Sequence, residues 1–204
     1  MAKIKICGIT NLDDAVAAQT YGADAIGFVF AKSPRRVAKE TVRRIAVNLP
    51  PFIQLVGVFV DDEKETVREI ARYCRLNLLQ FHGNESPEYC MGFHRKIIKA
   101  FRIKDARDIE QMMPYQGIAS AFLLDSYNPK LAGGTGQVFD WTIARKALKI
   151  GPIILAGGLN PDNVQEAIKA VQPYAIDAGS GVEGSPGKKD HSKMKLLIER
   201  AKSA

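Results

Sequence analysis

Short apolar stretches alternate with segments of helical periodicity along the whole 204-residue chain. The apolar stretches are rich in Ile, Val, Leu and Phe, which is typical of buried strands. We predict strands over residues 3–7, 25–30, 53–60, 78–81, 97–101, 121–125, 153–156 and 175–178. Eight such strand–helix units favour an α/β fold closed into a (β/α)8 TIM barrel, as a single domain over residues 1–204.

The segments between the strands carry the signals of helix ends. We predict helices over residues 11–21, 38–48, 63–74, 106–113, 141–149, 161–171 and 191–201, with a short one after residues 86–87. Asn11 can cap the first helix and Gly22 can end it, while Asn160 followed by Pro161 suits the start of the seventh. An open doubly wound sheet is the alternative, but the turn after the first strand lacks the GxGxxG pattern usual there.

The net charge of the chain indicates which classes of ligand it is expected to bind. There are 29 Lys and Arg against 22 Asp and Glu, a formal charge of +7, which fits an anionic small molecule. Nucleic acid is not expected, because no long basic block or basic–aromatic stripe accompanies the charge. The alternative is a solvated basic surface, which is the commonest cause of such a balance.

Neither a membrane segment nor a metal site is expected. The N-terminus mixes charged and apolar residues, and no run approaches the ~18 apolar residues of a membrane helix, so we expect a cytoplasmic protein. The three cysteines lack CxxC spacing, which indicates neither a disulfide framework nor a zinc ribbon. The sequence is silent on oligomeric state; a monomer is the default expectation and a homodimer is the alternative.

Polar side chains gather at the carboxyl ends of the predicted strands, where barrel enzymes carry their chemistry. Because strand side chains alternate, Cys7 should point into the barrel. The same alternation places Gln80 with His82 on one face, and Asp125 and Asp177 end the sixth and eighth strands. Singly, a strand cysteine is most often a small apolar residue, Asp125 can cap a loop and His82 can satisfy a turn. Together these residues favour a site.

Two lysines fall within predicted strands. If Lys5 and Lys99 point into the barrel they need carboxylate partners, since an unpaired buried charge is costly. Asp177 is one candidate partner. Cys74 and Cys90 lie in helical segments, where packing is their expected role.

Glycine clusters follow the seventh and eighth strands. Glycines let backbone N–H groups approach an anion closely, and barrels often bind phosphate in these two loops. Tight turns without a ligand are the alternative. We assign phosphate binding to Gly157, Gly158, Gly179, Ser180 and Gly181. A further cluster at 133–136 lacks the Lys-Ser/Thr of a P-loop and is interpreted as a mobile flap after the sixth strand.

Nine short motifs follow one another at residues 5–11, 22–30 with 33–35, 56–59, 80–83, 124–125, 133–136, 139–141, 157–161 and 180–183. The first reads KICGITN and the last reads SGVE. Each motif is short, but the set in this order closely resembles the phosphoribosylanthranilate isomerase family. The resemblance covers essentially the whole chain.

This resemblance implies a (β/α)8 barrel without a cofactor and an Amadori rearrangement in tryptophan biosynthesis. In that reaction N-(5-phosphoribosyl)anthranilate, an aminoaldose, becomes the aminoketose 1-(2-carboxyphenylamino)-1-deoxy-D-ribulose 5-phosphate. The family's general base corresponds to Cys7 and its general acid to Asp125. Its arginine for the anthranilate carboxylate corresponds to Arg35, with Arg36 as the rival because the loop varies there.

The chemistry explains these residue types. Opening the ribose ring requires a proton on the ring oxygen, so Asp125 has to begin protonated. The resulting iminium acidifies the hydrogen on sugar C2, which Cys7 removes as a thiolate. A free cysteine has a pKa of ~8.5, so a partial lowering near cationic groups would help, although the sequence does not give the pKa of Cys7. Gln80 and His82 are expected to orient sugar hydroxyls or Asp125, and Asp177 is a further substrate-binding candidate.

The chain departs from the family pattern at few positions. Gly179 stands where the family usually has Ser or Asn, so the backbone N–H is kept and a side-chain donor is lost. A related histidine-pathway isomerase is an alternative function, but it would be expected to have Asp where this chain has Cys7. A non-catalytic phosphosugar-binding module is disfavoured because both Cys7 and Asp125 are present, and no recognised motif supports nucleic-acid binding.

Overall fold

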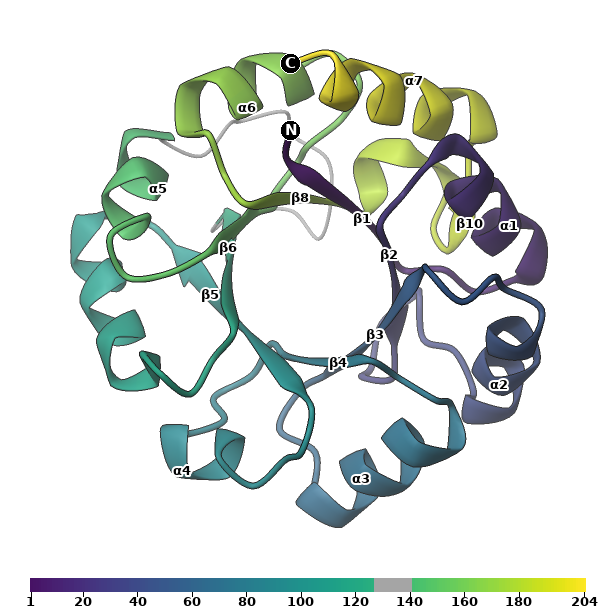
Figure 1. Ribbon diagram of the computed structural model, residues 1–204, viewed down its shortest axis with the longest axis horizontal. Coiled ribbons are helices and arrows are strands. Elements are labelled where there is room, and N and C mark those ends of the chain that lie inside the picture. The colour runs from purple at the N-terminus through teal and green to yellow at the C-terminus, as the bar shows by residue number, and fades with distance from the viewer. Residues whose placement is uncertain (127–140) are drawn as a thin grey trace.

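The computed structural model describes residues 1–126 and 141–204. Eight strands hydrogen-bond in chain order and close into a barrel, which confirms the predicted fold (Figure 1). Neighbouring strands are parallel, as strand–helix crossovers require. The strands are β1 (Lys3–Cys7), β2 (Ala25–Val29), β3 (Gln54–Phe59), β4 (Leu78–Phe81), β5 (Lys96–Ile103), β6 (Ala121–Ser126), β7 (Ile153–Leu155) and β8 (Ala175–Ala178).

Helices lie outside the strands around the barrel (Figure 1). They are α1 (Leu12–Tyr21), α2 (Lys39–Val47), α3 (Lys64–Tyr73), α4 (Pro87–Cys90), the 3-10 helix η1 (Ala106–Tyr115), α5 (Trp141–Ala147), α6 (Val164–Val171), the 3-10 helix η2 (Ser180–Val182) and α7 (His191–Lys202). Asn11 caps α1 by accepting a hydrogen bond from the Asp14 backbone N–H, and Gly22 ends it at a φ of 96°. Both predicted helix ends are confirmed.

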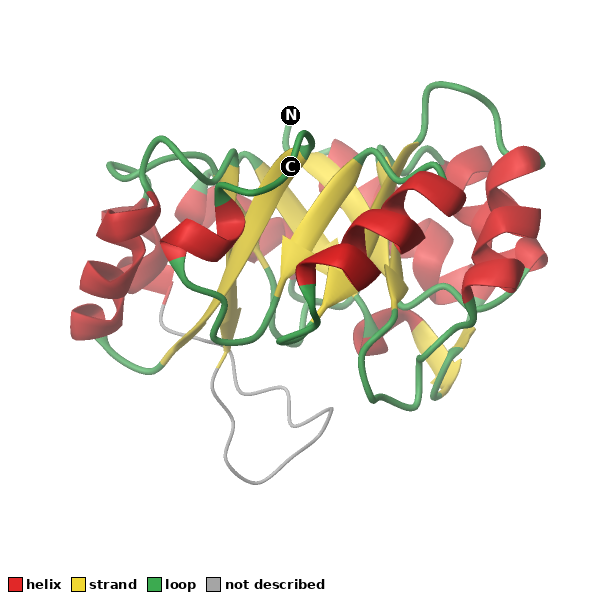
Figure 2. Cartoon of the chain, turned by 90° about the horizontal axis from the view of Figure 1, so that it is seen from below, coloured by secondary structure: helices red, strands yellow, loops and turns green. Residues whose placement is uncertain are grey.

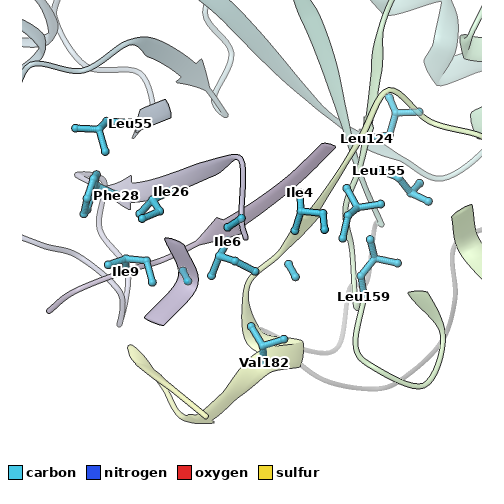
Figure 3. Close-up of a cluster of buried hydrophobic side chains, with 14 of the residues drawn as sticks. Ile4, Ile6, Ile9, Ile26, Phe28, Leu55, Leu124, Leu155, Leu159 and Val182 are labelled. Carbon is cyan, nitrogen blue, oxygen red and sulfur yellow. The ribbon is translucent and has the colours of Figure 1, made fainter. Parts of the chain in front are cut away.

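Strand side chains alternate between two apolar layers. The outer layer, between strands and helices, contains Ile4 and Ile6 of β1 together with residues of β2 and β7 (Figure 3). The inner layer fills the barrel and includes Ile98, Leu123 and Ile154. Because positions i and i+2 share a face, each inward-facing row runs on to the carboxyl end of its strand. Polar residues at those ends therefore meet at one mouth of the barrel.

The segments that follow β7 and β8 differ from the sequence predictions. Helix α6 begins at Val164 rather than at 161, because Asn160 Oδ1 accepts hydrogen bonds from the backbone N–H groups of Asp162 and Asn163 and forms a turn. An antiparallel hairpin of β9 (Glu183–Ser185) and β10 (Lys188–Lys189) was not predicted. Its strands are too short to show a two-residue period. In Figure 2 the hairpin lies on the side of the molecule opposite the N-terminus.

Some of the features predicted from the sequence fall on residues that the structure does not describe. The predicted flap at 133–136 and the motif residues 139 and 140 lie outside the described residues. Within 1–126 and 141–204, no helix has the length and apolar character that crossing a membrane needs. The same ranges contain no group of three or more His, Cys, Asp or Glu side chains placed to hold a metal ion.

Candidate active site

Cys7 ends β1 on the inward face of the strand, as the alternation predicts. Its Cα pairs with that of Gly27 on β2. A Cβ added at Gly27 would lie 2.8 Å from Cys7 Sγ and 3.2 Å from Lys5 Cε, closer than ordinary side-chain contacts. The absence of a side chain at Gly27 therefore provides the space that Cys7 and Lys5 share.

A buried ion pair lies beside the thiol. Lys5 Nζ donates to Asp177 Oδ1 at 2.9 Å and so joins β1 to β8. The two side chains are only 4% and 9% exposed. Burial acts to lower the pKa of Lys5, but the negative charges of Asp177 and Cys7 overcome it, so the pKa is raised and the side chain is an ammonium. The carboxylate partner that the sequence suggested for Lys5 is confirmed.

Burial has the largest effect on the acidity of Cys7. It raises the pKa of the thiol, the charge of Asp177 raises it further, and the ammonium groups of Lys5 and Lys189 oppose the shift. The net pKa lies above the ordinary value. The partial lowering that would help the base is not found: the cations are present, but the cost of desolvating a thiolate outweighs their attraction.

A second charged cluster joins the loop after β2 to the β9–β10 hairpin. Arg35 donates from Nε and Nη2 to the two carboxylate oxygens of Glu183, at 2.7 Å each. Lys189 donates to the same carboxylate at 3.1 Å and to the Gly179 carbonyl at 2.9 Å. Burial acts to raise the pKa of Glu183, but the hydrogen bond from Arg35 and the charge of Lys189 reverse this, and the pKa is lowered. The Arg35 chain passes over Gly8, where a Cβ would lie 2.6 Å from Arg35 Cδ.

Asp125 lies at the carboxyl end of β6 and continues the inward-facing row of Ala121 and Leu123. Its Oδ2 is 3.6 Å from Nε2 of His82, the residue after β4. Gln80 Nε2 donates to His82 Nδ1 at 3.2 Å. Asp125 is 33% exposed, whereas Gln80 is buried. These three polar groups therefore run from the barrel interior to its mouth, on the strand faces that the sequence predicts.

The two predicted glycine loops contact each other after β7 and β8. Gly157 and Gly158 have φ values of 83° and 72°, a conformation that favours glycine. A Cβ at Gly181 would overlap the carbonyl oxygen of Leu159, so only glycine allows η2 this close to the loop after β7. Apart from Gly158 itself and its two chain neighbours, no atom of the described residues lies within 4 Å of the position of a Cβ added at Gly158. The loops thus form a surface of accessible backbone at the mouth.

Lys99 faces the opposite way from Lys5. Its neighbours Ile98 and Ala100 belong to the inner layer, so Lys99 projects between the strands and the helices. There it lies 3.2 Å from the buried Glu85 carboxylate and donates to the Gly83 carbonyl at 2.8 Å. Lys99 therefore has a carboxylate partner, but it does not line the barrel.

Three charged residues near the mouth were not assigned a role from the sequence. Glu183 ends the SGVE motif, and Lys189 lies on the hairpin that has no sequence signal. Arg102 continues the inward-facing row of β5, and its Cα pairs with that of Asp125. Because the predicted strand stopped at residue 101, alternation could not place Arg102 at the mouth. Extending that strand by one residue would have identified it.

A closed parallel barrel with polar side chains at the carboxyl ends of β1, β4, β6 and β8 defines a TIM-barrel enzyme. The sequence model of the N-(5'phosphoribosyl)anthranilate (PRA) isomerase family matches residues 4–200. The chain belongs to this family, whose members are isomerases of tryptophan biosynthesis.

Relatives in sequence and structure span the full chain. It is 50% identical over 204 residues to N-(5'-phosphoribosyl)anthranilate isomerase of Geobacter metallireducens and 51% identical over 206 residues to that of Desulforudis audaxviator, with 100% of both chains covered in each case. The crystal structure of phosphoribosyl anthranilate isomerase from Thermotoga maritima superposes with a TM-score of 0.94 at 45% identity, covering 100% of both chains. A structure of such an isomerase in complex with reduced 1-(o-carboxyphenylamino)-1-deoxyribulose 5-phosphate has a TM-score of 0.91 at 43% identity, again with 100% of both chains covered.

Proposed function

We propose that the chain catalyses the Amadori rearrangement of N-(5-phosphoribosyl)anthranilate to 1-(2-carboxyphenylamino)-1-deoxy-D-ribulose 5-phosphate. The observation that carries the proposal is the position of Cys7 and Asp125, which end inward-facing rows of β1 and β6 at the same mouth. The full-length likeness to isomerases of this name supports it. The ligand of the related complex has the carbon skeleton of the proposed product.

Asp125 and Cys7 divide the acid and base work. Asp125 donates a proton to the ring oxygen, the bond between that oxygen and C1 breaks, and an iminium forms at C1. Cys7 then removes the C2 proton, and the electron pair of the C2–H bond neutralises the iminium to give an enolamine. Tautomerisation of the enolamine yields the aminoketone. Each positioned acid or base contributes ~10²–10⁴-fold to such a reaction.

Arg35 is the better candidate for the anthranilate carboxylate. Its side chain crosses Gly8, the residue after Cys7, and its guanidinium already binds a carboxylate in the bidentate geometry that suits arginine. Arg36 is exposed and bridges to β2 through its backbone. In this proposal the substrate carboxylate shares or replaces Glu183 as the partner of Arg35.

The remaining predicted residues bind the sugar and its phosphate. Backbone N–H groups of the two glycine loops hold the phosphate, and the residues concerned are Gly157, Gly158, Gly179, Ser180 and Gly181. His82 orients Asp125, and Gln80 fixes the His82 ring. Asp177 accepts a hydrogen bond from Lys5 at Oδ1 and presents its other oxygen to a sugar hydroxyl. The substrate is a small anionic molecule, and the cytoplasmic location stays a prediction.

The proposal is tested by turnover of N-(5-phosphoribosyl)anthranilate, followed by the loss of its anthranilate fluorescence. Cys7→Ala and Asp125→Asn should each retain the circular dichroism spectrum and lose at least ~10²-fold in kcat. Cys74→Ala, at a cysteine remote from the mouth, and Asp162→Asn, at a carboxylate that is 91% exposed, are the matched controls and should keep their activity. Near-normal turnover in either Cys7→Ala or Asp125→Asn would remove that residue from the mechanism.

A further inference from the structure

We propose that Lys5 is a positioning residue for the reaction, and that its buried ammonium keeps the Cys7 thiolate accessible as the base. This inference rests on the proposed function, in which Cys7 removes the C2 proton. Lys5 and Cys7 are two residues apart on the inward face of β1. The space above Gly27 accommodates both, because a single added Cβ there would contact Cys7 Sγ and Lys5 Cε together.

The position of Lys5 is fixed by Asp177 rather than by solvent. The 2.9 Å bond to Asp177 Oδ1 holds the ammonium at a site where the lysine side chain is only 4% exposed. A lysine that is desolvated so strongly keeps its proton only if an anion compensates it. Asp177 supplies one such charge, and the Cys7 thiolate supplies a second. Protonation of Lys5 therefore stabilises the thiolate form of Cys7, and the thiolate in turn stabilises the protonated form of Lys5.

The cations around Cys7 favour its thiolate, against the burial that raises its pKa. From the elements packed about it, Lys5 on β1, Arg35 in the loop after β2 and Lys189 on β10 are cationic. Asp177 on β8 and Glu183 on β9 are the anions that pair with them. Burial lowers the pKa of Lys189, and the Arg35 side chain is 26% exposed, so Lys5, whose pKa is raised, is the cation that keeps its charge in the most desolvated part of the cluster. A thiolate at Cys7 is therefore opposed by burial and stabilised chiefly by the charge of Lys5.

Lys5 stabilises the Cys7 thiolate more than the other two cations do. Arg35 binds both oxygens of Glu183, and Lys189 donates to the same carboxylate and to the Gly179 carbonyl. Lys5 is the cation whose favourable effect on the Cys7 thiolate is greatest, and it acts against burial and against Asp177. Removing the charge of Lys5 would leave burial and Asp177, both of which raise the pKa of Cys7, without their main opposing charge.

The test measures the ionisation of Cys7 directly. In Lys5→Met, the rate of iodoacetamide alkylation at Cys7, read by peptide mass spectrometry across a pH series, should give a thiol pKa at least one unit higher, equivalent to ~10-fold less thiolate at neutral pH. The fall in kcat should be similar with KM nearly unchanged, and the acidic limb of the kcat–pH profile should move upward. Cys74 and Cys90, whose burial raises the pKa of each to about 11, serve as internal references.

Two further variants keep the test decisive. Lys3→Met removes the exposed lysine at the start of the same strand, paired with Asp24, and should leave the titration and turnover of the enzyme unchanged. If Lys5→Met does not fold, the double variant Lys5→Met/Asp177→Asn avoids an unpaired buried carboxylate. It should raise the thiol pKa less than Lys5→Met alone does, because the opposing charge of Asp177 is removed as well.

The alkylation titration does not depend on turnover, so it separates this inference from the proposed function. Activity retained by Cys7→Ala would refute the function, whatever the titration shows. A Cys7 pKa that is the same with and without Lys5, or a raised pKa without a fall in kcat, would overturn the role of Lys5.

Discussion

The buried ion pair of Lys99 and Glu85 offers the sharpest test of how this barrel is stabilised. Lys99→Met keeps most of the aliphatic volume and removes the ammonium. The two side chains are 3% and 1% exposed, so the Glu85 carboxylate would be left without its countercharge in a site closed to water. The Gly83 carbonyl, 2.8 Å from Lys99 Nζ, would lose its donor as well.

The size of the expected loss in unfolding free energy depends on the hydrogen bonds that Glu85 retains in Lys99→Met. Removing one partner of a buried pair typically costs ~3–5 kcal/mol. Glu85 retains hydrogen bonds from the backbone N–H groups of Asp61 at 2.9 Å and Gly83 at 3.0 Å, which places the expected loss near ~3 kcal/mol. For a chain of this length that corresponds to a fall in Tm of roughly 6–12 °C.

Urea unfolding and calorimetry of four proteins test this value: wild type, Lys99→Met, Glu85→Gln and the double variant. The double variant should recover part of the sum of the single losses, because no uncompensated charge remains. Lys39→Met, at an exposed pair with Glu69, is the matched control and should unfold like wild type. A loss below ~1 kcal/mol in Lys99→Met, or strict additivity in the cycle, would refute the reasoning.

Two further predictions concern the Arg35–Glu183–Lys189 cluster. Arg35→Ala should raise KM by at least ~10-fold through loss of a charged bidentate contact, whereas Arg36→Ala should leave KM within a factor of about two; equal effects would contradict the assignment of Arg35. The pKa of Glu183 is lowered in the folded protein, so its contribution to stability is complete above its unfolded value of ~4.3 and is lost as pH falls through the folded value. Glu183→Gln should therefore flatten the acid side of the stability–pH curve measured by urea unfolding, and an unchanged acid slope would count against this linkage.

The two buried lysines show how far strand alternation can be trusted. Residue parity places Lys5 on the inward face of β1, and the Asp177 partner was identifiable because it ends another predicted strand. Parity along β5 equally shows that Lys99 cannot share the barrel interior with Ile98 and Ala100. Its partner Glu85 lies in the loop after β4, for which the sequence carries no periodic signal. The alternation of strand side chains therefore predicts which face of the sheet a residue lies on, but it does not predict an ion-pair partner that lies in a loop.

The local sequence was enough to determine the fold and most of the polar residues at the mouth. Apolar runs with a two-residue period and amphipathic segments with a helical period are properties of neighbouring residues, so eight strand–helix units and the positions of Cys7, His82 and Asp125 were readable from the chain. Strand limits were less certain, and Arg102 was missed because one more residue of β5 belongs to the sheet.

Only the tertiary structure decided which charges meet. Arg35 and Glu183 are 148 residues apart, and no feature of the sequence pairs them, yet barrel closure brings them within hydrogen-bonding distance. Asp177, which the sequence offered only as one candidate for Lys5 across 172 residues, also contacts it only in the closed barrel. The acidity of Cys7 was likewise undetermined, because it depends on burial as well as on the cations nearby. Desolvation and long-range pairing are properties of the closed barrel, since neither exists until β8 joins β1 and removes their side chains from water.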